Sequence, residues 1–472
     1  MLRERTPIVV LGAGPAGLAT ALRLARRGAF EVTVIERQGV VGGNAGSFEL
    51  EGLRVDYGSH RLHASCRPEI LADIRAMLGA ALLSRPRNGR IRLRGRWVRF
   101  PLHPLNLALH LPPAFFLGVL RDAVTKSRQG SARETFGGVL ERGLGKTICR
   151  DFYFPYAEKI WGLPPSELDA EQARRRVSAG SLSKVLRKVA ATVPGLRASN
   201  SACFFYPRNG YGQISEAYYR AATEAGVAVR FRETLTGVEL ADGRVVAVRT
   251  CGEDGVSCLP ARQVISTIPL PSLVRSVTPP APPEVLASTE ALRYRAMILI
   301  YLVMATTRFT EYDAHYFPER DVAITRLSEP KNYGLAEVDG TTVLCAELPC
   351  SPQEPVWKAS DQELGALVEE ALARADLPLH VPLRRVVTRR LEQAYPIYTL
   401  DYREHFDRLD DWVKNQEGLL SIGRQGLFAH DNTHHTLAMA YGASDCLDPA
   451  GKLDRERWAV YRRDFEEFVV ED

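Results

Sequence analysis

Three glycines in the run GAGPAG are the first residues of this 472-residue chain whose spacing indicates a chemical role. Gly12, Gly14 and Gly17 lie between a short apolar run and an alanine-rich stretch. The first glycine permits a tight turn, the second lets backbone amides approach a pyrophosphate, and the third lets strand and helix pack closely. The first turn of the helix then presents free N–H groups to the phosphates. We expect a pyrophosphate to contact Gly12, Gly14, Pro15, Ala16 and Gly17.

An acidic residue follows at the spacing that a nucleotide site requires. Glu36 comes nineteen residues after Gly17 and ends a second apolar run, EVTVIE. A carboxylate in this place accepts hydrogen bonds from both hydroxyls of an adenosine ribose. The alternative is a glycine-rich turn that holds no ligand. A second glycine-rich loop, GVVGGNAG, follows directly and brings more backbone within reach of phosphate and sugar groups.

These residues need a strand, a helix and a second strand to position them. PIVVLG has the β-branched, apolar composition of a buried parallel strand, and the helical pattern of residues 16–27 stops at Gly28. With EVTVIE this makes a right-handed β-α-β unit. Residues 261–270 form another buried strand, and LTGVELADGRVVAVRT predicts a hairpin that turns at Asp242 and Gly243.

Longer matches resemble a known group of proteins. GAGPAGL, VGGNAGSF and DYGSHRLH resemble the FAD-dependent amine oxidase and protoporphyrinogen oxidase superfamily, which includes UDP-galactopyranose mutase. Downstream, VISTIPL and LLSIGRQGLFAHDNTHHTLAMAYGAS resemble that superfamily's later FAD segments. The resemblance implies FAD as the cofactor, with a helix starting near Asp431 that points its positive end at the flavin. It adds to the cofactor contacts Glu36, Arg37, Gly42, Gly43, Asn44, Ala45, Gly58, Ser59, His60, Gly423, Arg424, Asp431 and Asn432.

The same resemblance implies an α/β fold. We expect a Rossmann-type FAD-binding domain with a parallel sheet, similar to glutathione reductase, and an inserted α+β substrate domain. The predicted FAD-binding domain is discontinuous and consists of residues 1–65, 201–270 and 386–472. The predicted substrate-binding domain consists of residues 66–200 and 271–385.

The middle of the chain is most similar to UDP-galactopyranose mutase. DFYFPYAEKIWGLPP, FFYPRNGYGQI and AYPIYTLDYREHF match segments of that group. Two of its phosphate-binding arginines are missing, since Ala346 takes the place of one and RRRVSAGS lacks the other. The sequence therefore predicts a relative that keeps the cofactor site and has changed its substrate.

Candidate catalytic residues come from DYGSHRLH and from the middle of the chain. The resemblance implies that DYGSHRLH, residues 56–63, lies beside the flavin ring, and we call it the flavin-side segment. His60 and His63, with His430 as an alternative, are candidates for a general base or a hydrogen-bond donor to the flavin. A purely structural role is the alternative for the histidines. Arg61 is expected to bind an anionic substrate group, with a structural salt bridge as the alternative, and Arg326 is expected to reach into the pocket. Tyr156, Trp161 and Tyr398 are expected to line the substrate cavity, with core packing as the alternative. We expect Arg174, Arg175 and Arg176 to form a solvated or interdomain face. The candidates are His60, Arg61, His63, Tyr156, Trp161, Arg326 and Tyr398.

Composition limits the partners. The net charge of +5 does not indicate nucleic acid binding, and the eight scattered cysteines and loose histidines predict no metal site. No apolar run is long enough to span a membrane, and no signal peptide precedes the first strand, so a cytoplasmic protein with free thiols is expected. LNLALHLPPAFFLGVL predicts a helix pair in the core or lining a pocket; the alternative is a surface for peripheral contact with membrane or a lipid-like ligand.

The expected function is hydride transfer from a small polar or ring substrate to flavin N5, with oxygen or another diffusible acceptor reoxidising the flavin. Because only one GxGxxG is present, a second dinucleotide-binding domain is not predicted. Reduction of the flavin by briefly bound NAD(P)H is an alternative. A sugar-nucleotide isomerase or mutase that uses reduced FAD is the second candidate, and its substrate would be sugar- or nucleotide-linked. The third is a binding or scaffold protein stabilised by FAD. No oligomeric state is predicted.

Overall fold

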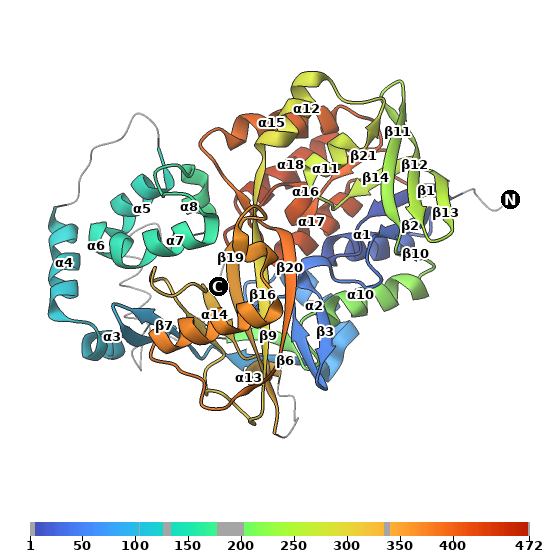
Figure 1. The fold of residues 1–472 in the computed structure, drawn as a ribbon. Helices are drawn as coiled ribbons and strands as arrows, with labels where there is room; N and C mark the ends of the chain where they lie inside the picture. The colour runs from blue at the N-terminus through green and yellow to red at the C-terminus, as the bar shows by residue number, and fades with distance from the viewer. Residues whose placement is uncertain (1–4, 103, 126–133, 177–202, 335–339, 471–472) are drawn as a thin grey trace.

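A five-stranded parallel sheet forms one half of the molecule in the computed structural model, which describes residues 5–102, 104–125, 134–176, 203–334 and 340–470 (Figure 1). The strand order is β10-β2-β1-β14-β21, with β1 at the centre. Its strands are β1 (Thr6–Leu11), β2 (Phe30–Glu36), β10 (Ala228–Phe231), β14 (Gln263–Ser266) and β21 (Leu419–Ser421). The predicted β-α-β unit, the strand within residues 261–270 and the Rossmann-type α/β fold are confirmed.

Each face of this sheet is covered because successive side chains of a strand point to opposite sides. Ile8 and Val10 pack against the helices on one face, whereas Val9 and Leu11 pack into a second cluster on the other. The first face carries α1 (Pro15–Arg26), α2 (Pro68–Leu78), α10 (Gln213–Glu224), α17 (Thr433–Asp445) and α18 (Arg455–Glu466). The second carries α11 (Leu270–Arg275), α12 (Pro283–Ala291), α15 (Tyr402–Lys414) and the sheet of β11 (Thr234–Ala241), β12 (Arg244–Gly252), β13 (Gly255–Pro260) and β15 (Val277–Thr278).

The predicted hairpin is also confirmed. β11 and β12 are antiparallel and turn at Asp242 and Gly243, both of which have positive φ. This is the backbone conformation that an Asp-Gly hairpin turn provides.

A seven-stranded mixed sheet forms the other half, in the order β20-β16-β19-β18-β17-β7-β8. One face packs on α14 (Asp361–Arg374), whose first turn is closed by a capping box between Ser360 and Glu363. The other face packs on the small β3–β4 sheet, so it lies next to the flavin-side segment. The strands are β7 (Gly89–Leu93), β8 (Arg96–Phe100), β16 (Arg293–Met304), β17 (Ala314–Tyr316), β18 (Arg326–Ser328), β19 (Thr342–Cys350) and β20 (Leu383–Ile397); β3 is Ser47–Leu50 and β4 is Leu53–Asp56.

Short helices extend from this half and form the left side of Figure 1. They are α3 (Pro104–His110), α4 (Pro113–Val124), α5 (Phe136–Leu144), α6 (Lys146–Ile148), the π-helical turn η3 (Cys149–Tyr153), α7 (Phe154–Trp161) and α8 (Ala170–Arg176). The helix pair predicted within residues 105–120 is confirmed, but the expectation that it lies in the core is wrong, because α4 has no buried residue. None of the helices in the described ranges is long and apolar enough to cross a bilayer.

The remaining elements connect the two halves. In a three-stranded sheet, β9 lies between β5 and β6. Its strand β5 forms the end of the flavin-side segment. The elements are η1 (Gly43–Ala45), β5 (Leu62–His63), η2 (Gly79–Ala81), β6 (Leu82–Pro86), β9 (Cys203–Pro207), α13 (Lys331–Gly334), η5 (Pro355–Lys358) and α16 (Gly423–Gly426).

Candidate active site and cofactor cradle

The turn between β1 and α1 requires glycine at positions 12 and 17, and it leaves empty space next to Gly14. Gly12 has φ +100°, and a Cβ there would lie 2.5 Å from the Thr267 hydroxyl oxygen. A Cβ on Gly17 would lie 1.9 Å from the carbonyl oxygen of Gly12, so helix and strand meet too closely for any side chain. A Cβ on Gly14 would meet nothing within 4 Å. The free amides at the start of α1 therefore face open space, as a phosphate site requires.

Glu36 lies beside this turn at the end of β2. Its carboxylate accepts a hydrogen bond from the backbone N–H of Ala13 at 2.8 Å and another from that of Gln38 at 2.8 Å. The residue is 8% exposed, whereas its neighbour Arg37 points to solvent. Glu36 is thus held at the glycine turn by backbone donors.

The second glycine-rich loop crosses the first. The N–H of Gly42 donates to the carbonyl of Ala13 at 2.9 Å, and a Cβ on Gly43 would lie 3.5 Å from the Cα of Gly14. Asn44 donates through Nδ2 to the Gln393 carbonyl at 3.4 Å, which connects this loop to β20. The two loops therefore form one continuous backbone surface.

The C-terminal segment completes the cradle. A Cβ on Gly423, which has φ +79°, would lie 3.2 Å from the Cβ of Ala16 in the first turn of α1. Arg424 donates to the carbonyls of Asp431 at 2.9 Å and Ala394 at 3.0 Å, and burial lowers the pKa of its guanidinium. α17 begins at Thr433 after the N-cap residue Asn432, two residues from the predicted start.

Asp431 stands out within this segment because its carboxylate is buried without a hydrogen bond from any described residue. The Nδ1 atom of His435 lies 3.3 Å away, and it already accepts a hydrogen bond from the Asn432 N–H. A buried carboxylate without a donor is costly. Asp431 therefore has hydrogen-bonding capacity for a ligand.

The flavin-side segment is anchored by Asp56. The carboxylate accepts from the Ser47 hydroxyl and the Tyr206 hydroxyl, both at 2.6 Å, and from the Tyr211 N–H at 2.8 Å. Burial raises the pKa of this carboxyl group. Gly58 follows at φ +93°, so the chain turns sharply before Ser59 and His60.

His60 has one nitrogen engaged. Its Nε2 lies 2.9 Å from the carbonyl oxygen of Tyr57, so Nε2 carries the proton and donates, while its ring stacks on Tyr211 at 5.3 Å. Burial lowers the pKa of the imidazole. The ring is therefore neutral at pH 7, and Nδ1 is its acceptor.

A buried ion pair that the sequence analysis missed supports this segment. Glu347 on β19 accepts from the Ser59 N–H at 2.9 Å and from two nitrogens of Arg326 on β18 at 2.7–2.9 Å. Their side chains are 5% and 16% exposed, respectively. Burial alone would lower the pKa of the Arg326 guanidinium, but Glu347 and the surrounding tyrosines together outweigh burial and the pKa rises. An acid within the apolar run VLCAELPC was the signal that could have identified this pair.

Aromatic rings and two more guanidinium groups lie close to Arg326. Tyr395 and Tyr156 both affect its pKa electrostatically. The Arg176 guanidinium lies 5.6 Å from the Tyr395 ring centre and 5.9 Å from that of Trp161, and Arg424 lies 5.1 Å from Tyr395. The predicted residues Arg326, Tyr156 and Trp161 are thus brought into one cluster, together with Arg176 and Tyr395.

Two other predicted residues point elsewhere. Arg61 packs over the rings of Phe204 at 4.9 Å and Tyr333 at 5.6 Å. The Nδ1 atom of His63 lies 2.7 Å from the Ser65 hydroxyl oxygen, and its ring stacks on His434 at 6.4 Å. The Nε and Nη2 atoms of Arg61 are buried without a described acceptor, and the predicted roles of Arg61 and His63 stay predictions. Among the described residues, no group of three His, Cys, Asp or Glu side chains could hold a metal ion.

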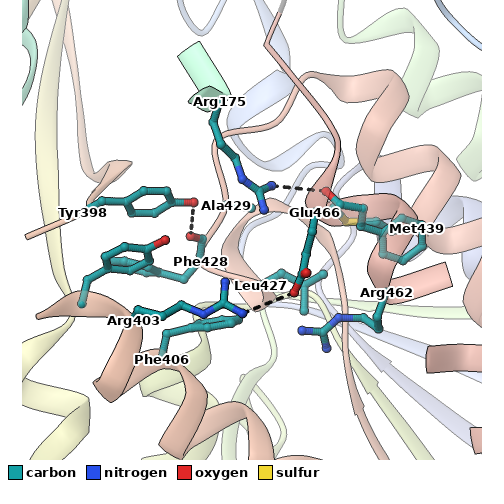
Figure 2. Close-up of a pocket in the computed structure, with 12 residues that line it drawn as sticks. Arg175, Tyr398, Arg403, Phe406, Leu427, Phe428, Ala429, Met439, Arg462 and Glu466 are labelled. Atoms are coloured by element: carbon teal, nitrogen blue, oxygen red, sulfur yellow. Dashed lines mark hydrogen bonds and ion pairs between the residues drawn. The ribbon is translucent and has the colours of Figure 1, made fainter. Parts of the chain in front are cut away.

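Tyr398 lines a small pocket outside the cradle (Figure 2). Its hydroxyl donates to the Phe428 carbonyl at 2.9 Å, and its ring stacks on Tyr402 at 4.1 Å. Burial raises the pKa of its phenol. The pocket has no lining residue from the β1–α1 turn or from η1, so it is not the cofactor site.

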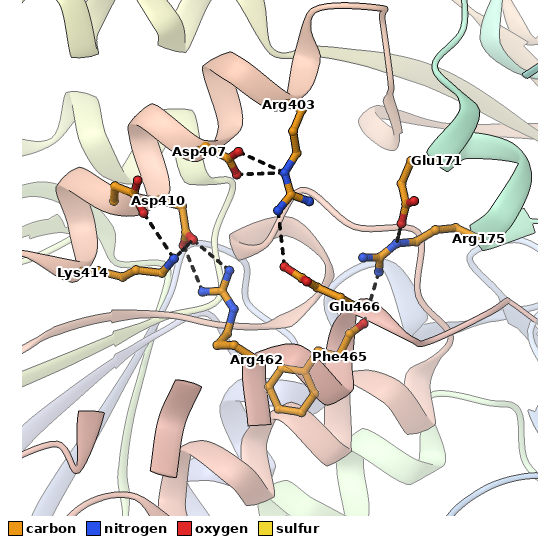
Figure 3. A network of polar contacts seen from close by, with 10 residues as sticks. Glu171, Arg175, Arg403, Asp407, Asp410, Lys414, Arg462, Phe465 and Glu466 are labelled. Carbon is orange, nitrogen blue, oxygen red and sulfur yellow. Dashed lines mark hydrogen bonds and ion pairs between the residues drawn. The ribbon is translucent and has the colours of Figure 1, made fainter. Parts of the chain in front are cut away.

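An ion-pair network borders the same pocket (Figure 3). Arg175 donates to Glu171 at 2.8 Å and to the Phe465 carbonyl at 3.2 Å. Arg462 donates to both oxygens of Asp410 at 2.8–3.0 Å. These contacts join α8, α15 and α18. The solvated alternative is therefore wrong for Arg175, which is buried, whereas its contact with α18 is of the kind that the interdomain alternative expects. Arg176 packs on aromatic rings.

Comparison with known proteins defines the family. A family model described as flavin containing amine oxidoreductase matches residues 15–443, and the chain belongs to this family. Phytoene dehydrogenase of Streptomyces griseus is 30% identical over 285 residues, which are 56% of this chain and 54% of the relative. Phytoene desaturase of Fusarium fujikuroi is 26% identical over 282 residues, which are 56% and 49% of the two chains. The chain thus spans about half the length of the curated relatives it matches.

The fold is that of reduced UDP-galactopyranose mutase, with a TM-score of 0.77 at 21% identity over 94% of this chain and 93% of the mutase. FAD is the cofactor of the family, and the residues present fit it. The open space before Gly14 and the unsatisfied carboxylate of Asp431 are the two observations that show the fit.

Proposed function

We propose that the chain is an FAD-dependent oxidoreductase that takes hydride from a small polar or ring-shaped substrate. The convergence of both ends of the chain on the first turn of α1 is the observation that supports this most strongly, with Gly43 next to Gly14 and Gly423 next to Ala16. Bound FAD supplies the flavin N5 that accepts a hydride.

Residues of the cradle have distinct tasks in this proposal. The amides at the start of α1 bind the pyrophosphate, and Glu36 accepts hydrogen bonds from the ribose hydroxyls. Asp431 accepts from a further hydroxyl of the cofactor, which satisfies its buried carboxylate. Gly12 and Gly17 keep the turn narrow enough for these contacts.

On the substrate side, Glu347 holds two groups in position at once. It fixes the Ser59 amide of the flavin-side segment and orients the Arg326 guanidinium. Arg326 and Arg176 present planar donors to an anionic group, and the rings of Tyr156 and Tyr395 exclude water around it. His60 is neutral and can accept a substrate proton at Nδ1. These features support a substrate that combines a ring with an anionic group.

Anaerobic mixing of the purified holoprotein with amines, cyclic alcohols and porphyrinogens tests this proposal. A true substrate bleaches the flavin absorbance, and air restores it. R176Q should raise KM for that substrate by about tenfold with little change in kcat, since a charge contact to the substrate is lost. The matched control is R174Q, because Arg174 is 56% exposed. If all three classes leave the flavin oxidised, this proposal fails.

The arginine cluster also favours a second candidate, a sugar-nucleotide isomerase that uses reduced FAD. Ala346 faces the core and offers no charge, but Arg326 on the neighbouring strand and Arg176 on α8 supply guanidinium groups. This candidate predicts turnover only after reduction with dithionite or NADPH, without net oxidation. Tight binding of UDP in titration calorimetry would favour it, and absence of binding would eliminate it.

A further inference from the structure

The helices α3 and α4 expose an unusual amount of apolar surface. Among the described residues, nine large apolar side chains are strongly exposed, and five of them belong to these two short helices. Their exposed fractions range from 63% to 86%. They are Leu105, Leu109, Leu117, Leu120 and Val124. Scattered single residues of this kind need no explanation, but a contiguous group marks an interaction surface.

Within each of the two helices, the exposed side chains share a face because of helical spacing. Leu117, Leu120 and Val124 are separated by three and four residues, and Leu105 and Leu109 by four. The inner side of α4 is fixed, since Phe115 and Phe116 pack against the cluster that includes Val98 and Leu111. A Cβ on Gly118 would lie 2.6 Å from the Thr147 hydroxyl oxygen, so α4 also sits directly on α6. Among the residues that the structure describes, none covers the outer apolar face.

Positive charge accompanies this face. Residues 74–121 contain nine arginines and no aspartate or glutamate. Arg96, Arg99 and Arg121 are exposed, and none of them pairs with a carboxylate of a described residue. The Arg99 N–H donates to the Asn106 side chain at 2.8 Å, which places β8 next to α3. We call these three arginines and the five apolar residues the α3–α4 surface.

We infer that the α3–α4 surface docks on the headgroups of an anionic lipid bilayer. Leucines that enter the outer part of the bilayer and arginines at the level of the phosphates are the features of an interfacial helix. α4 has 12 residues, fewer than the roughly 20 needed to span the hydrocarbon core, so the helices lie on the membrane. Figure 1 shows both helices at the outer left edge, away from the five-stranded sheet.

The surface also lies close to the substrate side of the molecule. The cluster beneath it includes Phe152 and Tyr316. Phe152 stacks on Tyr156 at 5.9 Å, and both tyrosines affect the pKa of Arg326. Contacts between aromatic rings therefore connect the docking face with the arginine cluster. The inference itself does not depend on the reaction proposed above.

Co-sedimentation with vesicles tests this inference on the full-length holoprotein. The vesicles are phosphatidylcholine alone or with about 30% phosphatidylglycerol, an anionic lipid. Wild type should pellet with the anionic vesicles, and raising NaCl from about 0.1 M to about 0.5 M should release it because salt screens the headgroup charge. L109Q/L117Q/L120Q should reduce the partition coefficient by at least about tenfold. R96Q/R99Q/R121Q should abolish the preference for anionic over neutral vesicles.

Matched variants distinguish this surface from general stickiness. V246Q/V256Q/V460Q changes three exposed apolar residues elsewhere, and R220Q/R262Q/R293Q removes three exposed arginines elsewhere. Both should bind vesicles like wild type, and circular dichroism and flavin content should be unchanged in all four variants. Failure of wild type to bind anionic vesicles would overturn the inference, as would equal losses in the control variants. A wild-type dimer that L109Q/L117Q/L120Q dissociates, without vesicle binding, would instead make this face an interface between copies of the chain.

Discussion

The cofactor side and the substrate side of this site consist of different chemical groups. The cofactor side consists of backbone brought close together by glycines, as in the 1.9 Å that a Cβ on Gly17 would leave to the Gly12 carbonyl. The substrate side consists of charged and aromatic side chains, with the Arg326–Glu347 pair at its centre. The Gly12–Gly17 contact depends on residues close in sequence, whereas Gly423 meets Ala16 and Glu347 reaches Ser59 only when distant segments are assembled. The glycine turn itself is therefore local, and the substrate side depends on how two sheets are assembled.

Substitution at Gly17 and Gly14 should produce the largest effect and separate fold from ligand binding. G17A forces the turn open, so we expect lower stability and FAD affinity weakened by about a hundredfold or more. G14A should leave the unfolding of the cofactor-free chain unchanged, because its Cβ meets nothing, yet weaken FAD by about tenfold. Thermal unfolding and fluorescence titration measure the two quantities. Equal affinity for FAD in G14A and wild type would show that the space before α1 is not the phosphate site.

Breaking the buried pair should produce the next largest effect. E347Q leaves the Arg326 charge buried without a partner, which costs about 3–5 kcal/mol of unfolding free energy. The exposed pair Arg244–Glu417, with side chains 64% and 58% exposed, gives the matched control. E417Q should cost about 1 kcal/mol or less. Urea unfolding of the holoproteins compares them, and similar losses in both variants would contradict the central role given to Glu347.

Acid should destabilise both sides of the molecule. Burial lowers the pKa of His434, next to the cradle, to about 2. Burial, with help from the Arg90 charge, lowers the pKa of His315, in the seven-stranded sheet, to about 3. The unfolded chain has ordinary imidazoles with pKa near 6.5, so below that pH it takes up protons that the folded chain does not. Stability is thus full above about pH 6.5 and falls by about 1.4 kcal/mol per pH unit for each ring.

H315Q and H434Q should each reduce the slope of unfolding free energy against pH by the contribution of one proton. Urea unfolding at several values between pH 7 and pH 5 gives the slope. An unchanged slope in H315Q would mean that its ring already carries a proton in the folded chain.

Substitutions at Tyr395 and Tyr398 should give the smallest effects. They test which of the two tyrosines belongs to the substrate site. Y398F removes a buried hydrogen bond to Phe428 and should cost about 1 kcal/mol of stability, with kcat/KM unchanged. Y395F keeps the ring that packs between Arg176 and Arg424, so its stability should match wild type. If the substrate contacts the Tyr395 hydroxyl, KM should rise by several-fold. A loss of kcat in Y398F with normal stability would instead show that Tyr398 has a catalytic role.

The contrast between the two sides explains what the sequence could predict. Gly12, Gly17 and Glu36 could be recognised because their spacing alone determines a turn, a helix start and a strand end. Glu347 could not be placed, because its partner depends on the register that sets Arg326 opposite it on β18 and β19. Tyr398 was selected from the segment AYPIYTLDYREHF, but a strand pattern does not reveal that Tyr395 is the residue next to Arg176 and Arg424. For α4, apolar composition indicated burial, but no helix or strand of the described ranges covers its outer face.

Titration of FAD into the cofactor-free chain tests most directly whether the two ends of the chain enclose one flavin dinucleotide. The structure predicts saturation at one FAD per chain, with quenched flavin fluorescence and a shifted absorbance spectrum. A colourless protein that takes up no added FAD would contradict the account of the cradle, from Gly14 to Asp431.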